Sequence, residues 1–357
     1  MIKSDIVIIG GGLTGLTLAH LLNKEEIPFT IIESRERLGG RIHTVTNQKS
    51  PPTEMGATWL GTNHKNLMSL LEELNIDVFP QVMGKTAIYE AFSLTPHQLV
   101  QLPPNQPSSY RIKGSTSHLI NTLSNQLRLD QLLLNEEVKS IQENENRVCI
   151  QTNSETILSK LVISTLPPLL LKRTITVTPA LPDKLQDIME NTHTWMSESI
   201  KISLSFEHPF WKDNNSTGTI FSNVGPIPEM YDHSNNESNL YALKGFLNFS
   251  YHSVSKEERL QAVLKQLRKY YGDLVDNYTA YHEMVWSKEK YTYTPYSDPI
   301  LPHQNNGHPA YQEPYLNGRL IIAGSETSTE FSGYMEGAIK SAHNTHKLVK
   351  IQLKNIN

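Results

Sequence analysis

The chain has 357 residues, a formal net charge of −4 and one cysteine, Cys149. This length supports one large hydrophobic core or two medium ones, and a mildly acidic chain without a block of Lys and Arg is not expected to bind nucleic acid or anionic lipid. A lone cysteine excludes a disulfide framework, and no apolar run approaches the roughly 18 residues of a membrane span, so we expect a cytoplasmic protein without a membrane anchor.

The N-terminal residues predict a β–α–β unit with a glycine-rich turn. The continuous apolar run 6–9 is typical of a parallel strand buried on both faces, helical spacing follows over 16–23, and 29–33 forms the second strand. The turn contains the glycines of a G-x-G-x-x-G fingerprint, Gly10, Gly12 and Gly15. Such glycines let the backbone approach a pyrophosphate at a helix N-terminus. Glu33, about 20 residues later, can accept hydrogen bonds from ribose hydroxyls and would repel a 2′-phosphate, which disfavours NADP.

Later segments predict a mixture of helices and strands. Helical spacing indicates helices over 66–74, 117–127 and 257–270, and a last helix from about 334. Strands are expected over 138–141, 148–150, 161–164 and 199–206, and a buried strand, a sharp turn and a helix start are expected over 318–338. The Pro-, Gln- and Ser-rich residues 95–109 are expected to form a loop.

The strand expected over 199–206 alternates apolar and polar residues. Lys201, Ser203 and Ser205 point away from the apolar face. A lysine on the polar face of a half-buried strand is most often solvated, so the pattern by itself favours an exposed Lys201.

Several motifs resemble the flavin-containing amine oxidase family, which includes monoamine oxidases, polyamine oxidases and L-amino acid oxidases. The most specific are the run from Glu33 to Arg41 with its paired glycines, and the segments 323–327 and 332–338 near the end. Further family segments are matched in the same order at 54–61, 113–115, 135–138, 162–168 and 256–260. The region 61–111 is much shorter than in those enzymes, which implies a more open cavity or one completed by a partner.

The resemblance implies FAD as the cofactor. Monoamine oxidases carry a flavin-linking cysteine where this chain has Pro295, so the flavin is expected to be bound non-covalently. Glu326 is expected to hydrogen-bond the ribityl chain, and the helix near Tyr334 to direct its positive end at the flavin ring. The cofactor-binding residues that the resemblance and the fingerprint imply are Gly10, Gly12, Leu13, Thr14, Gly15, Glu33, Ser34, Arg35, Gly40, Arg41, Gly56, Ala57, Thr58, Trp59, Val138, Gly324, Glu326, Tyr334 and Met335.

The resemblance also implies three catalytic residues. Lys201 matches the family lysine that reaches a water molecule at flavin N5, where a cation would favour reoxidation by O₂. Tyr334 and Tyr296 are expected to form an aromatic pair that holds the amine against the flavin. Tyr296 is placed by counting ten residues from Trp286, and Tyr291 and Tyr293 nearby leave that register open.

The expected fold class is α/β, with a Rossmann-like FAD-binding domain and a smaller, mixed-sheet substrate domain. The FAD-binding domain is expected to comprise 1–79, 112–190 and 289–357, and the substrate domain 80–111 and 191–288. The scattered histidines lack metal-ligand spacing, so no metal is expected. The oligomeric state stays open, a homodimer included.

The leading functional hypothesis is an FAD-dependent amine oxidase. Hydride would pass from the α-carbon of an amine to flavin N5, the imine would hydrolyse, and O₂ would reoxidise the flavin to give H₂O₂. Two alternatives stay open. One is a flavin dehydrogenase or desaturase that acts on an apolar substrate, as in the protoporphyrinogen and carotenoid branches of the superfamily, and the other is a non-catalytic flavoprotein.

Overall fold

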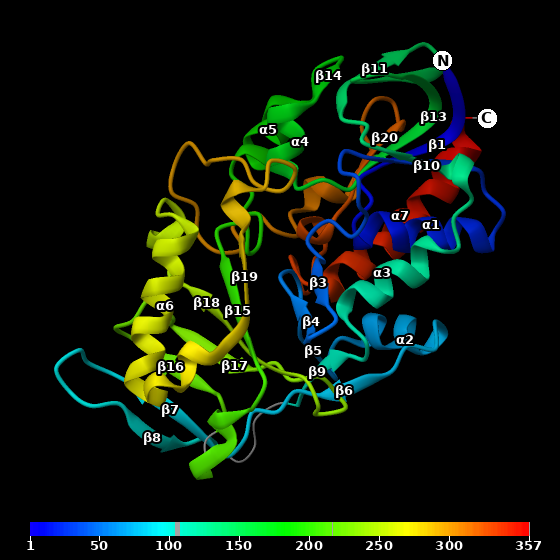
Figure 1. Cartoon of the computed structure of the whole chain (residues 1–357). Coiled ribbons are helices and arrows are strands. Elements are labelled where there is room, and N and C mark those ends of the chain that lie inside the picture. The colour runs from blue at the N-terminus through cyan, green and yellow to red at the C-terminus, as the bar shows by residue number, and fades with distance from the viewer. Residues whose placement is uncertain (104–107, 216, 357) are drawn as a thin grey trace.

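An eight-stranded sheet organises the half of the molecule that carries both termini (Figure 1). The computed structural model describes residues 1–103, 108–215 and 217–356. The strands of this sheet are β1 (Ile2–Ile9), β2 (Phe29–Glu33), β10 (Leu132–Leu134), β11 (Val138–Asn144), β12 (Arg147–Thr152), β13 (Thr156–Ser164), β14 (Thr176–Thr178) and β20 (Leu320–Ile322). Their order is β10-β2-β1-β13-β12-β11-β14, with β20 beside β13. Because β2, β1, β13 and β20 are parallel, their carboxyl ends meet at one edge.

Helices cover both faces of this sheet. On one face, α1 (Leu13–Lys24), α3 (Thr116–Ser124) and α7 (Met335–Ile356) share a core with Ile6 and Ile8, and α2 (Lys65–Glu73) packs against α7. On the opposite face, α4 (Pro168–Thr174) and α5 (Asp183–Glu190) share a core with Val7 and Ile9. Successive residues of β1 therefore enter two separate cores, which explains its continuous apolar run.

A seven-stranded sheet forms the other half of the molecule. Its strands are β7 (Thr86–Glu90), β8 (Gln98–Gln101), β15 (Ile200–Phe206), β16 (Ile220–Ser222), β17 (Glu229–Asp232), β18 (Tyr241–Leu247) and β19 (Tyr278–Val285), in the order β19-β15-β18-β17-β16-β7-β8. One face packs on α6 (Lys256–Tyr271) through residues such as Ile202, Leu243 and Val263. The opposite face carries Lys201 and lies against β4 (Ser50–Glu54).

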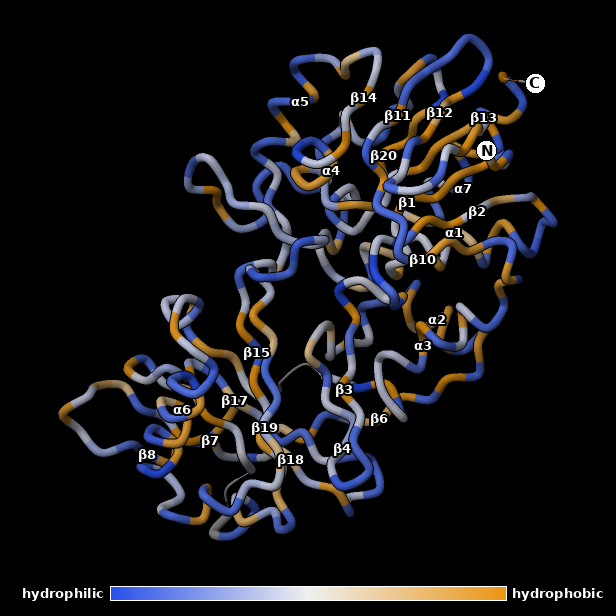
Figure 2. Tube along the Cα trace, turned by 45° about the horizontal axis from the view of Figure 1, so that its top comes forward, coloured by the Kyte–Doolittle hydropathy of each residue, from blue (hydrophilic) through white to orange (hydrophobic). Residues whose placement is uncertain are grey.

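Two small sheets lie between the large ones. β4 pairs with β3 (Thr44–Asn47), and β9 (Ser109–Ile112) pairs with both β5 (Leu60–Gly61) and β6 (Val78–Pro80). In Figure 2 the inner strands β1 and β13 are coloured hydrophobic, while many of the connecting loops are hydrophilic. Because binding residues are found most often on loops held by a rigid scaffold, we expect a ligand site at the loops that follow the strands.

The predicted fold class is confirmed, and the expected helices over 66–74, 117–127 and 257–270 correspond to α2, α3 and α6. The expectation of a loop over 95–109 was wrong in part, because residues 98–101 form β8 and pair antiparallel with β7. Sheet pairing outweighed the proline-rich composition there, since the prolines lie outside the paired residues. Residues 104–107 of that segment lie outside the described residues, and the proposed domain boundaries stay a prediction.

None of the described helices has both the length and the apolar character that a membrane crossing requires. Within the same described residues, no three His, Cys, Asp or Glu side chains gather as they would around a metal ion.

Candidate functional site

A pocket opens at the carboxyl ends of the parallel strands, the position where open α/β sheets bind ligands. Its wall includes Ile9 and Glu33, which end β1 and β2, and Thr165 and Ser325, which follow β13 and β20. The predicted cofactor residues that line the pocket are Gly10, Gly12, Leu13, Thr14, Glu33, Ser34, Arg35, Gly40, Arg41, Ala57, Val138, Tyr334 and Met335. The fold thus brings residues from both ends of the chain to one site.

The glycines of the first turn leave an open gap in the pocket wall. A Cβ atom on Gly12 would have its nearest described neighbours, in Gly39 and Gly40, at 4.0 Å. The small residue at Gly12 is therefore not required by packing within the protein, and it leaves room for a phosphate. Gly15 differs, because its Cβ would lie 2.1 Å from the carbonyl oxygen of Gly10. Gly15 instead permits the close packing of α1 on the turn.

The N-terminus of α1 lies beside this gap. Gly12 is the N-cap residue, makes no side-chain cap hydrogen bond, and is followed by a first turn without acidic residues. Leu13 and Thr14 of that turn line the pocket. Free N–H groups and the helix dipole at such an end favour an anion. The gap and the helix end together fit a diphosphate.

Glu33 lies at the end of β2, and only 5% of its surface is exposed. Its Oε2 accepts a hydrogen bond from the backbone N–H of Gly11 at 2.8 Å, and its Oε1 accepts one from Arg35 N–H at 2.9 Å. Each carboxylate oxygen can accept a second bond. Glu33 is thus held rigidly and retains the capacity to accept bonds from ribose hydroxyls.

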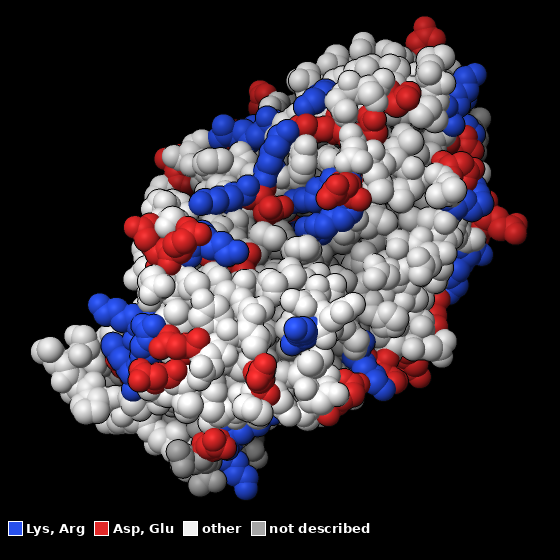
Figure 3. All heavy atoms as spheres, viewed as in Figure 1, with Lys and Arg blue, Asp and Glu red and all other residues white. Residues whose placement is uncertain are grey.

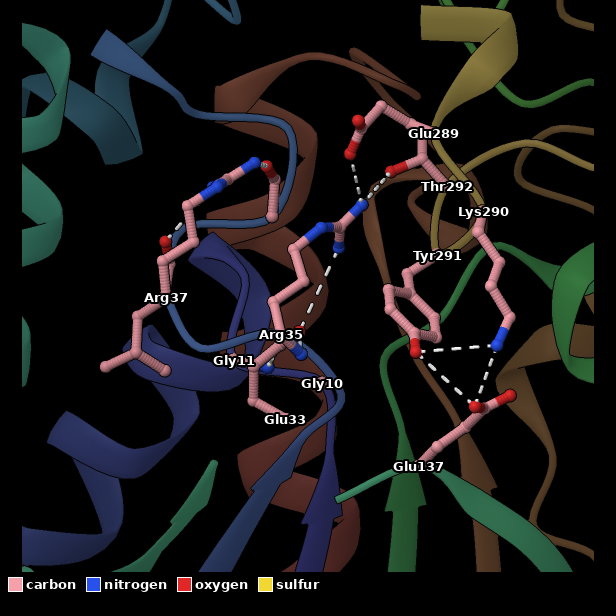
Figure 4. A network of polar contacts seen from close by, with 12 residues as sticks. Gly10, Gly11, Glu33, Arg35, Arg37, Glu137, Glu289, Lys290, Tyr291 and Thr292 are labelled. Carbon is pink, nitrogen blue, oxygen red and sulfur yellow. Dashed lines mark hydrogen bonds and ion pairs between the residues drawn. The ribbon is translucent and has the colours of Figure 1, made fainter. Parts of the chain in front are cut away.

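The segment 289–292, called the strap below, lies across the pocket from Glu33. Lys290, Tyr291 and Thr292 line the pocket. The guanidinium of Arg35 donates from Nη2 to Glu289 Oε2 at 3.1 Å and to Thr292 Oγ1 at 3.0 Å (Figure 4). Arg35 was expected to contact the cofactor, and the structure uses part of its guanidinium to hold this strap.

Glu326 is buried in an ion pair with Arg41. Both oxygens are engaged: Oε1 with Arg41 Nη1 at 2.6 Å, and Oε2 with Arg41 Nη2 at 2.8 Å. The Trp195 N–H and the Ser325 hydroxyl donate two further hydrogen bonds to Glu326. Burial alone would raise the pKa of Glu326, but the charge of Arg41, its hydrogen bonds and the Ser325 hydroxyl hold the pKa below its usual value. Glu326 therefore anchors Arg41 and Trp195 here, and its expected bond to a ribityl chain stays a prediction.

The start of α7 reaches the same pocket. Tyr334 and Met335 line it, so the positive end of this 22-residue helix faces the pocket, and its direction toward a flavin ring stays a prediction. Glu336, in the first turn, is turned away and accepts hydrogen bonds from the backbone N–H groups of Asn66 and Leu67. The carboxylate of Glu336 therefore caps α2 and is not a ligand-binding group.

Lys201 is 5% exposed, so the solvated position that its strand pattern favours is wrong. Its Nζ donates to the carbonyl oxygen of Gly56 and approaches Thr58 Oγ1 at 3.5 Å. Burial lowers the pKa of Lys201 to about 8, despite smaller opposing effects of Glu54 and Glu229. The ammonium group is thus directed at the segment 56–58, whose Ala57 lines the pocket.

A second buried lysine, Lys244, shares this environment. Lys244 lies on β18 directly opposite Ser203 of β15, and its Nζ also hydrogen-bonds Thr58 Oγ1. Burial, followed by the charge of Lys201, lowers the pKa of Lys244 well below its usual value. The two lysines therefore share one buried environment, in which the charge of Lys201 disfavours the charged form of Lys244.

The two expected cage tyrosines have different neighbours. The Tyr296 hydroxyl accepts a hydrogen bond from Thr194 N–H at 2.9 Å. The Tyr334 ring is 40% exposed, and its centroid lies 5.4 Å from that of Trp195 and 6.2 Å from that of His303. Tyr334 therefore belongs to an aromatic surface in which Trp195, His303 and His64, whose centroid lies 6.3 Å away, are its described ring neighbours, and Tyr296 is not among them.

Four further predicted cofactor residues, Gly56, Thr58, Trp59 and Gly324, are not among the residues that line the pocket. Gly56 and Thr58 hold Lys201, and Trp59 Nε1 donates to Gln81 Oε1 at 3.0 Å. Gly324 has a φ of +127°, and a Cβ there would lie 3.2 Å from the carbonyl oxygen of Thr165.

Sequence reasoning missed several residues of the site. Lys244, Trp195 and His303 lie in segments without a motif. Of the strap residues that line the pocket, only Tyr291 was named from the sequence, as an alternative to Tyr296, and Lys290 and Thr292 were not predicted. Only Lys244 carried a usable signal, because it interrupts the apolar strand 241–247 as Lys201 interrupts its own. The other positions depend on contacts between segments far apart in the chain.

Comparison with known proteins assigns the chain to a family. The model of the flavin containing amine oxidoreductase family matches residues 93–345, and that of an NAD(P)-binding Rossmann-like domain matches residues 8–74. The first match covers most of the chain. The chain therefore belongs to the flavin containing amine oxidoreductase family, and it is a flavin-dependent oxidoreductase by that membership.

The chain is similar over nearly its whole length to individual members. It is 25% identical to the probable flavin-containing monoamine oxidase A of Dictyostelium discoideum, with 98% of each chain covered. It is 23% identical to the human amine oxidase [flavin-containing] B, covering 95% of this chain and 84% of the human one. The Dictyostelium alignment spans 456 positions, more than the 357 residues here, so that relative carries insertions that this chain lacks.

Solved structures share the fold. Putrescine oxidase bound to putrescine superposes with a TM-score of 0.86 at 20% identity, covering 98% of this chain and 99% of that one. Cyclohexylamine oxidase from Brevibacterium oxydans superposes with a TM-score of 0.85 at 17% identity, with the same coverage.

Proposed function

We propose that the protein is an FAD-dependent amine oxidase that binds its flavin non-covalently. The observation that carries the proposal is the meeting, in one pocket, of the glycine gap at the start of α1, Glu33 and the start of α7. When bound there, FAD would accept a hydride from the α-carbon of an amine and pass the electrons to O₂, giving H₂O₂. Family membership and the similarity to putrescine oxidase and cyclohexylamine oxidase support this assignment.

The residues present fit the parts of FAD. Glu33 would bind the ribose hydroxyls, and the gap at Gly12 with the α1 N-terminus would bind the diphosphate. The N-terminal end of α7 would stabilise negative charge on the flavin ring. Non-covalent binding is supported by Pro295 at the linking position and by Cys149, which lies in β12 away from the residues that line the pocket.

Lys201 would supply the cation for the oxygen step. With a pKa of about 8, its ammonium group is charged at pH 7. A buried cation stabilises developing negative charge more strongly than a solvated one, because the surrounding dielectric is low. Lys244, whose pKa is lowered by burial and by the charge of Lys201, hydrogen-bonds Thr58 beside it.

The exposed ring of Tyr334 would receive the amine. Tyr334 lines the pocket and carries Trp195 and His303 beside it. Electron-rich rings attract the amine and orient its α-carbon. We therefore assign substrate contact to Tyr334 first, and Tyr296 stays the predicted second ring.

The test is anaerobic flavin bleaching. Purified protein with bound FAD is mixed with putrescine, cyclohexylamine or an L-amino acid without oxygen, and air is then admitted. We expect one amine class to bleach the flavin, and air to restore its absorbance with release of one H₂O₂ per flavin. Flavin that stays oxidised with every amine would overturn the proposal.

A flavin dehydrogenase that acts on an apolar substrate is the second candidate. The observation that favours it is that Tyr334 lines the pocket whereas Tyr296 does not, since an amine oxidase of this family is expected to pair two rings. This enzyme would be bleached by its substrate but would recover slowly in air and rapidly with an artificial electron acceptor. The relative rates with O₂ and with the acceptor therefore separate the two functions.

A further inference from the structure

The strap is fixed to the rest of the chain at both of its ends. Before it, Trp286 Nε1 donates to the carbonyl oxygen of Met55 at 2.8 Å, and after it, the Tyr296 hydroxyl accepts from Thr194 N–H. The N–H groups of Thr292, in the strap, and of Tyr293, directly after it, both donate to the carbonyl oxygen of Glu289. The strap is therefore a compact turn whose position depends on the side-chain contacts between its anchors.

Those contacts form two joints, one on each side of the strand ends (Figure 4). In the first joint, Arg35 binds Glu289 and Thr292. In the second, Glu137 Oε2 accepts from Lys290 Nζ at 2.9 Å and from the Tyr291 hydroxyl at 3.4 Å. Arg35 follows Glu33 by two residues, and Glu137 directly precedes Val138, so both joints adjoin residues expected at the adenosine end of the cofactor.

The two joints differ in their exposure to water. The side chains of Arg35 and Glu289 are 11% and 29% exposed, whereas those of Lys290 and Glu137 are 66% and 21% exposed. An exposed lysine pair contributes little and is screened by salt. A half-buried guanidinium–carboxylate pair with an added hydroxyl contact is stronger and less sensitive to salt. The Arg35 joint therefore holds the strap, and the Glu137 joint opens readily.

We propose that the strap closes the adenosine end of the pocket, and that the Arg35–Glu289 joint sets the rate at which the dinucleotide leaves. The proposal rests on the proposed binding of FAD. Lys290, Tyr291 and Thr292 face the same pocket as Gly10 and Glu33, so a dinucleotide between them is enclosed on two sides. Glu289 itself does not line the pocket, and it acts as a positioning residue through Arg35.

The experiment compares FAD release from the holoprotein after rapid dilution, followed by the rise in free-flavin fluorescence. Glu289→Gln keeps the size of the side chain and removes its charge, and we expect release to become at least about tenfold faster. Lys290→Met, in the exposed joint, is expected to change the rate less than about twofold. Glu207→Gln, an exposed carboxylate after β15, is the matched control and leaves the rate unchanged.

A second readout follows the strap without flavin. Trypsin cleaves after Lys288 and Lys290, and we expect faster cleavage there in Glu289→Gln apoprotein, whereas the unfolding midpoint of the apoprotein stays that of the wild type. A wild-type release rate in Glu289→Gln overturns the proposal, and so does a lower unfolding midpoint that accounts for the faster release. Thr292→Val, which removes the other acceptor of Arg35, must also accelerate release.

Release is measured without turnover, so the proposal is separable from the proposed function. Normal FAD binding with strap-dependent release but no amine oxidation counts against the oxidase assignment alone. A protein that binds no FAD overturns both.

Discussion

Two glycines of one fingerprint serve different physical purposes in this protein. Gly12 leaves a gap toward the pocket, whereas Gly15 allows α1 to pack against the carbonyl oxygen of Gly10. The same residue type is therefore needed for ligand approach at one position and for folding at the other.

This difference gives a prediction for a matched pair of substitutions. Gly12 has a φ of −80°, so Gly12→Ala is compatible with its backbone, and we expect normal stability with FAD affinity weakened by at least about tenfold. Gly15→Ala places its Cβ 2.1 Å from an oxygen atom and is expected to cost about 2 kcal/mol of unfolding free energy. Urea unfolding of the apoproteins and FAD titration measure the two effects. Equal effects of both substitutions would contradict this distinction.

Lys201 predicts a pH dependence of flavin reoxidation. Its pKa is about 8, below the usual 10.5, so the ammonium group is present below pH 8 and is lost as the pH rises through that value. We expect the reoxidation rate by O₂ to fall over this range, because the neutral amine cannot stabilise negative charge. In Lys201→Met the rate at pH 7 should fall roughly 100-fold and become independent of pH around 8.

Stopped-flow absorbance of the reduced protein mixed with O₂ measures these rates. Lys265→Met, on the exposed side of α6, serves as the control and should reproduce the wild-type profile. An unchanged pH profile in Lys201→Met would show that another group carries the effect.

At the scale of elements, Glu336 couples two helices. It belongs to the first turn of α7, yet its carboxylate accepts from Asn66 Nδ2 at 2.6 Å and from Leu67 N–H at 2.8 Å at the start of α2. The N-cap residue of α2, His64, makes no side-chain cap bond. The N-terminus of α2 is therefore capped by a residue about 270 positions later, a contact between distant elements that replaces a local one.

We predict that Glu336→Ala lowers the unfolding free energy by about 2 kcal/mol, because two backbone N–H groups lose their acceptor in a buried position. Urea denaturation measures the change. Glu72→Ala, an exposed acidic residue on α2 itself, is expected to change stability by less than about 0.5 kcal/mol. Similar values for the two variants would mean that Glu336 does not act as a cap.

At the scale of the whole molecule, the pocket joins segments from the whole length of the chain. Residues near 10, 40, 138, 165, 291 and 335 line it. On the face seen in Figure 3, Lys and Arg side chains are interspersed with Asp and Glu. We propose that the pocket, which these segments line, recognises the dinucleotide.

Ligand binding across these segments should stabilise the whole fold. Free FAD at 100 times its dissociation constant is expected to add about 2.7 kcal/mol to the unfolding free energy. NADP at the same concentration should add almost none, because Glu33 would repel its 2′-phosphate. Thermal unfolding at several ligand concentrations measures both, and an equal shift with NADP would argue against the assigned role of Glu33.

Local patterns by themselves predicted the first elements of the fold and a dinucleotide cofactor. The apolar run of β1, the glycine turn and Glu33 lie within the first 33 residues. Because a β–α–β unit is built from neighbouring segments, residues that are close in this part of the sequence are also close in space. The helices α2, α3 and α6 likewise follow from periodicity, since one face of each must be apolar.

Only the tertiary structure decided the states of individual side chains. The pattern of β15 favours a solvated Lys201, but the packing of β4 against that face buries Lys201 beside Lys244 and lowers its pKa. The Tyr296 hydroxyl accepts a hydrogen bond from the backbone N–H of Thr194, and the carboxylate of Glu326 forms an ion pair with Arg41. The burial of a side chain and its hydrogen-bond partners depend on elements from distant parts of the chain. The spacing of residues in the sequence does not show how those elements pack together.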